Sequence, residues 1–158
     1  MNGEFELVHG PLGRPIGGLA WDGAGMLFSD INESVILRFD ARTRAVTQVR
    51  KYTNRTNGIA FGPDGVLYGC QEGSRRMVAY MPDGSARTMA TRLGDRVHNH
   101  PYRVAVDRRG RIWFSDLRNP VTAAGTQHFP PPDHQSVLRL VQGQRPRNDW
   151  KIERMTYD

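Results

Sequence analysis

The polar segment from Arg96 to Arg103 holds most of the side chains in this sequence that could bind a ligand. Its two histidines, His98 and His100, fall on the same side of an extended chain, as two-nitrogen ligation of a metal ion would require. They could equally hydrogen-bond to loop backbone or face solvent, since the sequence establishes no carboxylate partner for them. His98 and His100 are therefore weak candidates for a metal site.

Asn99 and Arg103, in the same segment, supply an amide that donates and accepts hydrogen bonds and a permanent cation. Such a pair suits an anionic or hydroxyl-rich ligand. The same two residues could instead only fix the start of a strand. The sequence favours neither reading over the other.

Two aspartates, Asp30 and Asp116, end similar apolar strands and could point toward a common channel. The simpler interpretation, which we prefer, is an Asx turn that satisfies the following backbone amides. Glu72 lies close to Cys70, a pairing that suggests a nucleophile. No Gly-x-Ser-x-Gly, His-Glu-x-x-His, phosphate-binding glycine loop or paired-cysteine motif supports catalysis, so the catalytic residues stay unknown.

The elements that would position these residues recur three times along the chain. Each copy reads as an apolar strand, a short Asp/Gly turn and a second apolar strand, at residues 18–30, 57–70 and 103–116. Steps of 40 and then 45 residues align both an alanine and a glycine of the copies: Ala20, Ala60 and Ala105; Gly25, Gly65 and Gly110. Repeats of this length with β signals predict propeller blades. Unrelated hairpins of a β-sandwich are the weaker alternative.

Each copy continues into two further strand-like runs, which gives the four antiparallel strands of a blade. The sequence thus predicts one all-β domain, a partial propeller over 1–158, with blades at about 17–52, 57–93 and 102–158. A long loop, 117–134, interrupts the third blade, and loops of that length are usually functional or disordered.

In such blades the Asp/Gly turns line one face, and the ends of the second strands and the links between blades line the other. The segment 96–103 and the long loop belong to the second face, where we place the site, because binding residues gather on irregular loops over a rigid scaffold. A short alternating run at 5–9 is either a strand that closes the last blade or a loose terminus.

Composition and charge argue against two classes of partner, nucleic acids and membranes. The net charge of +6 comes almost entirely from arginine, but the arginines are spread along the chain without stacking aromatic residues, which argues against nucleic acid. No apolar run reaches the length of a membrane span, and the N-terminus lacks signal-peptide features. A single cysteine, Cys70, suits a reducing compartment. We therefore expect a cytoplasmic protein with no membrane partner.

The order of the repeated motifs resembles the gluconolactonase, regucalcin and luciferin-regenerating-enzyme family. The motifs are Leu-Ala-Trp-Asp … Leu-Phe-Ser-Asp-Ile (19–31), Asn-Gly-Ile-Ala-Phe-Gly-Pro-Asp-Gly … Cys-Gln-Glu-Gly-Ser-Arg-Arg (57–76) and Val-Asp-Arg-Arg-Gly-Arg-Ile-Trp-Phe-Ser-Asp (106–116). With Asp-His-Gln-Ser-Val-Leu-Arg-Leu (133–140), the likeness covers about 15–158 and corresponds to the N-terminal half of the family. It implies a six-bladed propeller, of which this chain holds about three blades, an incomplete ring.

The resemblance also implies metal-dependent hydrolysis of a sugar-acid or similar lactone by the complete propeller. A divalent cation, calcium or zinc, would polarise the lactone carbonyl and activate a water molecule. The family's glutamate ligand precedes a Gly-Pro, but here that place reads Gly17-Gly18-Leu19. Its other two ligands belong to a fourth and a fifth blade. None of the usual metal ligands can be carried over, which makes the metal doubtful for this chain.

The family's third-blade sequence Asn-Ser-Pro-Asn-Asp is written here Asn99-His-Pro-Tyr-Arg103. Asn99, and more loosely Arg96, match the substrate-contacting loop, and together with His100 and Arg103 they are our predicted substrate-binding residues. Enzyme activity would need the missing blades, downstream or from a second chain, since two copies could close a six-bladed ring. The alternative is a non-catalytic propeller that binds a ligand or a protein through 94–103 and 117–134.

Overall fold

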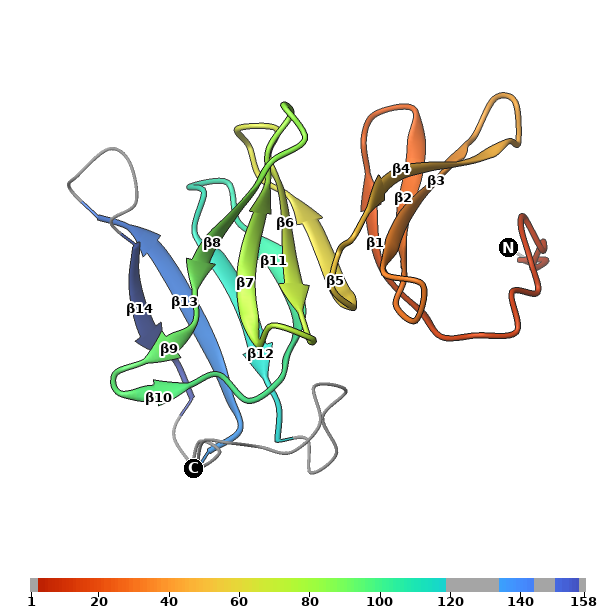
Figure 1. The fold of residues 1–158 in the computed structure, drawn as a ribbon. Helices are drawn as coiled ribbons and strands as arrows, with labels where there is room; N and C mark the ends of the chain where they lie inside the picture. The colour runs from red at the N-terminus through yellow and green to blue at the C-terminus, as the bar shows by residue number, and fades with distance from the viewer. Residues whose placement is uncertain (1–2, 119–133, 144–149, 157–158) are drawn as a thin grey trace.

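The computed structural model describes residues 3–118, 134–143 and 150–156, and every regular element within them is a β-strand (Figure 1). Three four-stranded antiparallel sheets follow one another along the chain, each with its strands in sequential order. The predicted fold class, an all-β incomplete propeller, is confirmed. Most of the predicted loop 117–134 lies outside the described residues. No helix in the described part of the chain is long and apolar enough to cross a membrane.

The three sheets are the blades. Blade one contains β1 (Ile16–Trp21), β2 (Gly25–Asp30), β3 (Val35–Asp40) and β4 (Val46–Lys51). Blade two contains β5 (Thr56–Phe61), β6 (Leu67–Gln71), β7 (Arg76–Tyr80) and β8 (Ala86–Ala90). Blade three contains β11 (Pro101–Val106), β12 (Ile112–Asp116), β13 (Ser136–Gln142) and β14 (Trp150–Arg154).

The first strand of each blade is its innermost strand, so β5 contacts β1 on one side and β11 on the other. The core fills the two layers between blades because alternate residues of each strand point at the neighbouring sheet. Between blades one and two it includes Ile36, Ile59 and Val78. Between blades two and three it includes Met77 and Phe114. Burial therefore fixes how the inner strands lie relative to one another.

The link between blades two and three contains an element that the sequence did not suggest. Strands β9 (Arg92–Leu93) and β10 (Arg96–Val97) form a short hairpin. Figure 1 shows this hairpin beside the outer strands β8 and β14. The link thus leaves blade two at its outer edge before returning to the inner strand β11.

The N-terminal run 5–9 forms no strand, and Phe5 is fully exposed. It lies against blade one, where the Glu6 carboxylate pairs with Arg44 at 2.8 Å and the His9 ring contacts Phe28. A closing strand would need the free edge of a last blade. Since the described residues include no such last blade, both readings of this run stay predictions.

Strand register corrects one detail of the repeat alignment. Within each blade an alanine of the inner strand faces the second strand, in the pairs Ala20–Leu27, Ala60–Tyr68 and Ala105–Trp113. The first turn of blade one is thus one residue shorter than its counterparts, which an alignment on the turn glycines cannot reveal. At the far end the equivalent pairs are Ile16–Asp30, Thr56–Gln71 and Pro101–Asp116. Gln71, not Cys70, is the counterpart of Asp30 and Asp116.

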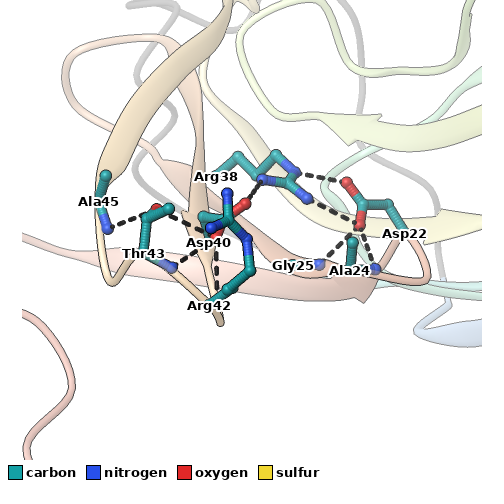
Figure 2. A network of polar contacts seen from close by, with 8 residues as sticks. All are labelled: Asp22, Ala24, Gly25, Arg38, Asp40, Arg42, Thr43 and Ala45. Atoms are coloured by element: carbon teal, nitrogen blue, oxygen red, sulfur yellow. Dashed lines mark hydrogen bonds and ion pairs between the residues drawn. The ribbon is translucent and has the colours of Figure 1, made fainter.

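Asp-based turns join the strands at the face opposite to Asp30, Gln71 and Asp116. Figure 2 shows how the turns of blade one are held. Arg38 donates from Nε to Asp22 at 2.6 Å and from Nη1 to Asp40 at 3.0 Å. The Arg38 hydrogen bond and the Ala24 amide lower the pKa of Asp22 to about 2. Hydrogen bonds from Thr43 and Arg38 lower the pKa of Asp40 as well. One guanidinium thus joins two turns that are distant in sequence.

We expect Arg38→Met to destabilise the protein at neutral pH and to matter less in acid. The folded pKa of Asp22 lies below its usual 3.8, so its stabilisation is present above about pH 4 and is lost as pH falls toward 2. Urea unfolding of both proteins between pH 7 and pH 2 measures this difference. Arg42→Met, at an exposed arginine of the same turn, is the control. A difference that did not shrink in acid would contradict the ion-pair explanation.

Candidate functional site

Three side chains meet where the inner strands of blades two and three begin. Arg103 donates from Nη1 to the Asn57 Oδ1 at 3.0 Å, and its Nη2 lies 3.5 Å from the Tyr102 hydroxyl. The Arg103 guanidinium also lies over the Tyr102 ring, 4.4 Å from its centroid, a cation–π arrangement. Asn57 is buried, whereas Arg103 is exposed. The result is a cation held in place by a buried amide and open to solvent.

The guanidinium borders a cavity of about 470 Å³ along the inner strands. Glycines from two blades, Gly17, Gly18 and Gly58, line it together with Ile16, Leu19, Phe28, Ile59 and Val104. A Cβ built on Gly17 would lie 2.5 Å from Asn57 Oδ1 and 3.5 Å from Arg103 Nη1. The absence of a side chain at Gly17 therefore makes room for the Arg103–Asn57 contact.

Arg103 occupies a position that is glycine in the other two blades. Strand register makes it the counterpart of Gly18 and Gly58. A Cβ on Gly18 would lie 2.3 Å from the Asn57 carbonyl oxygen, and one on Gly58 would lie 2.6 Å from that of Tyr102. These glycines let adjacent inner strands approach closely. At the third position the chain places a long cation instead.

Asp116 holds the predicted segment in place. Its carboxylate accepts hydrogen bonds from the backbone amides of Asn99 at 3.1 Å and His100 at 2.7 Å, and lies 3.2 Å from His98 Nδ1. All four residues are buried. The Asx turn preferred from the sequence is therefore wrong for Asp116, because its partners precede β11. Asp30 does accept from the Glu33 amide, at 3.3 Å, but also binds Arg14 Nε at 2.5 Å.

The two histidines contact different carboxylates. His98 approaches Asp116, as above, and packs edge-on against Phe114. His100 Nδ1 lies 3.9 Å from Glu72 Oε1, and its ring lies 5.4 Å from that of Tyr102. Burial lowers the pKa of His100, and this effect outweighs the opposite effect of the Glu72 carboxylate. The lowered pKa favours a neutral imidazole at pH 7. His100 thus packs against Tyr102, the ring over which the Arg103 guanidinium lies.

Glu72 joins this side of the site to blade one. Its carboxylate lies 3.5 Å from Arg55 Nη2, and Arg55 Nη1 donates to Asn32 Oδ1 at 3.1 Å. The nearby Cys70 is fully buried, and burial raises the pKa of its thiol well above the usual value. A protonated, inaccessible thiol cannot act as a nucleophile. Cys70 is therefore a core residue, as the missing catalytic motif indicated.

The predicted substrate-binding residues do not all come together. Arg103 lines the cavity, and His100 stands behind Tyr102. Asn99 donates its side-chain amide to the Leu117 carbonyl at 2.6 Å, so it fixes the start of blade three. Arg96 lies exposed on the β9–β10 hairpin, beside outer strands. Asn57 and Tyr102 escaped the sequence reasoning, although Asn57 opens the most complete copy of the repeated motif.

Several solved structures share this fold. A gluconolactonase from Xanthomonas campestris is 28% identical with a TM-score of 0.75, over 89% of this chain and 46% of that one. A structure studied as a candidate gluconolactonase is 20% identical with a TM-score of 0.71, over 87% and 47%. The resemblance to the gluconolactonase family is confirmed. Luciferin-regenerating enzyme shares the fold at 14% identity and a TM-score of 0.52, over 68% and 40%.

No protein-family model matches the sequence, and no curated protein does either. The chain spans about half the length of the gluconolactonase structures that it resembles. These structures cover close to nine-tenths of this chain. The gluconolactonase likeness therefore applies to the whole partial propeller rather than to a single blade.

The metal site implied by the gluconolactonase family does not fit the described residues. Gly17 stands where the glutamate ligand is expected, and the Arg103 guanidinium lies beside it. Within residues 3–118, 134–143 and 150–156, no three His, Cys, Asp or Glu side chains group to hold a metal ion. A fixed positive charge next to that place would repel a divalent cation. The side chains present favour an anion there.

Proposed function

We propose that this protein binds a sugar-acid lactone, or a lactone of similar size, in the cavity along β1, β5 and β11, and supports its hydrolysis. The observation that carries the proposal is Arg103, held at the edge of this cavity in a fold shared with a gluconolactonase. The glycine-lined wall leaves space for a sugar ring. The apolar residues around it would contact the ring carbons.

Arg103 would act on the reacting carbonyl. A water molecule attacks the lactone carbonyl carbon, and the ring carbon–oxygen bond of the resulting tetrahedral intermediate then breaks. One proton of the water reaches the departing ring oxygen, and the other is lost to solvent as the acid product ionises. Negative charge develops on the carbonyl oxygen in the tetrahedral intermediate, and the carboxylate formed when the acid product ionises is also an anion. A guanidinium has five N–H donors, and within the described part of the chain Asn57 and Tyr102 engage two of them. The others can stabilise the oxyanion, a type of contribution that is usually large.

Lactone turnover tests this proposal directly. With glucono-δ-lactone as substrate, we expect Arg103→Met to lower kcat/KM by roughly 100-fold, as removal of an oxyanion donor does elsewhere. Arg96→Met, the same change at the other predicted arginine, should reduce it by only about twofold at most, since a peripheral surface charge contributes little. Equal losses in both variants would contradict the proposal, and so would absence of turnover in a sample that contains a completed ring.

Metal dependence is measured in the same assay. The side chains described around Gly17 do not fit a metal, so a chelator should leave turnover unchanged, and added calcium or zinc should not raise it. Loss of turnover on chelation would mean that groups outside the described residues hold a metal. Saturable gluconate binding without turnover would favour the alternative, a non-catalytic binding propeller.

A second chain that completes the ring is also proposed. On blade one, outside the cavity, the Trp21 side chain is 53% exposed, an apolar surface that a further blade could cover. Light scattering after size-exclusion chromatography gives the oligomeric state. A monomeric protein that still hydrolyses the lactone would rule out this requirement.

A further inference from the structure

A second hollow lies between blades two and three at the opposite end of the strands, among the Asp-based turns. It has a volume of about 270 Å³ and shares no lining residue with the cavity along the inner strands. Its lining includes the polar or aromatic residues Asp64, Tyr68, Arg87, Arg109, Arg111, Gln142 and Trp150. Three arginines around so small a volume are unusual for a surface gap, because like charges repel at short range.

Strand register explains how Arg87 reaches this hollow. Tyr68 pairs with Ala79, and Ala79 pairs with Arg87, so the three residues form one row on the same face of blade two. Tyr68 and Ala79 belong to the core shared with blade three. Arg87 therefore extends that apolar layer outward, and its side chain points toward blade three.

The Arg87 guanidinium is incompletely satisfied. Its Nε is buried and has no hydrogen-bond partner among the residues that the structure describes. Buried donors are nearly always paired with protein or ordered water, since an unpaired one costs about as much as a lost hydrogen bond. An acceptor that enters the hollow would remove this cost. The orphaned donor thus indicates a ligand with oxygen acceptors.

The charges in the hollow do not balance. Arg111 is neutralised by Asp107, with Nε 2.6 Å from Oδ2. Arg87 and Arg109 have no ion pair among the described residues. The carboxylate of Asp64 accepts from the Tyr68 hydroxyl at 2.8 Å. Two unpaired guanidinium groups therefore face one carboxylate, which leaves a net positive site.

We propose that this hollow binds a small organic anion, with its phosphate or carboxylate group on Arg87 and Arg109 and its carbon body against Trp150. Guanidinium forks match the geometry of both kinds of anion. The volume is too small for a large ligand and larger than a bare phosphate needs. The site does not depend on lactone hydrolysis, so either proposal can fail without the other.

Isothermal titration calorimetry at low salt, with phenyl phosphate and benzoate as probes, tests the site and separates phosphate from carboxylate. We expect saturable binding of at least one probe, at least tenfold weaker in Arg87→Met and severalfold weaker in Arg109→Met. Arg108→Met removes the same charge from an exposed neighbour outside the hollow and should bind like the unmodified protein. Phenol, the uncharged analogue, should not bind.

Thermal unfolding of each variant shows whether it is folded, and Arg109→Met, at an exposed residue, keeps the test valid if Arg87→Met is not. The indole N–H signal of Trp150 should also shift with the bound probe and not with phenol. No saturable binding of either probe up to about 10 mM, or equal weakening in Arg108→Met and Arg109→Met, would overturn the proposal.

Discussion

Asp116→Ala should destabilise the protein by about 3–5 kcal/mol, the usual cost of breaking a buried polar network that contains a charge. The carboxylate is 1% exposed and faces two backbone amides and His98. Alanine would leave these donors buried without acceptors. Urea unfolding measures the loss, and amide hydrogen exchange at Asn99 and His100 should accelerate if the segment is released.

Asp30→Ala is the matched control, because Asp30 holds the equivalent place in blade one. Its main partner, Arg14, is partly exposed and can return to water, and its contact with the Glu33 amide is long, at 3.3 Å. We therefore expect a loss of only about 1–2 kcal/mol. Equal losses of unfolding free energy in the two variants would show that Asp116 stabilises its segment no more than Asp30 stabilises blade one. Turnover by Asp116→Ala should also fall, because β11 carries Arg103.

The sequence predicted the all-β propeller fold because local patterns determine its strands. Apolar alternation and Asp/Gly turns define strand pairs that hydrogen-bond to near neighbours in the chain. The repeat alignment was wrong by one residue at Gln71. Gly25 and Gly65 align even though the first turn of blade one is one residue shorter, so the sequence alone does not show the difference in turn length. The β9–β10 hairpin has only two residues per strand and no alternation, so no pattern could reveal it.

The candidate site was harder to predict because it depends on contacts between blades. Arg103 was identified from its chemistry, but its partner Asn57 lies 46 residues away, and only the packing of β5 on β11 brings them together. Arg96 is the other arginine of the same predicted segment, so its sequence position suggested a place in the same site. The hairpin takes Arg96 to the outer strands, a consequence of tertiary structure that single-sequence reasoning cannot supply.

Gly58→Ala should be one of the most damaging single-methyl changes in the chain, with a loss of about 3 kcal/mol, at the upper end of overpacking effects. A Cβ there would lie 2.6 Å from the Tyr102 carbonyl oxygen and 2.9 Å from the Arg103 Cα. Both are backbone atoms, so rotating a side chain cannot relieve the clash. Strands β5 and β11 would have to separate, which would open the core between blades two and three and move Arg103 from Asn57.

Gly65→Ala distinguishes this clash from ordinary glycine strain. Gly65 has a φ of +75°, but a Cβ there would meet no atom within 4 Å. Its loss should be about 1–2 kcal/mol, the cost of a left-handed conformation alone. Urea unfolding compares the two variants, and glucono-δ-lactone turnover near the unmodified rate is expected only for Gly65→Ala. If Gly58→Ala were as stable as Gly65→Ala, the inner strands would not need their close approach, and Arg103 would not be positioned by it.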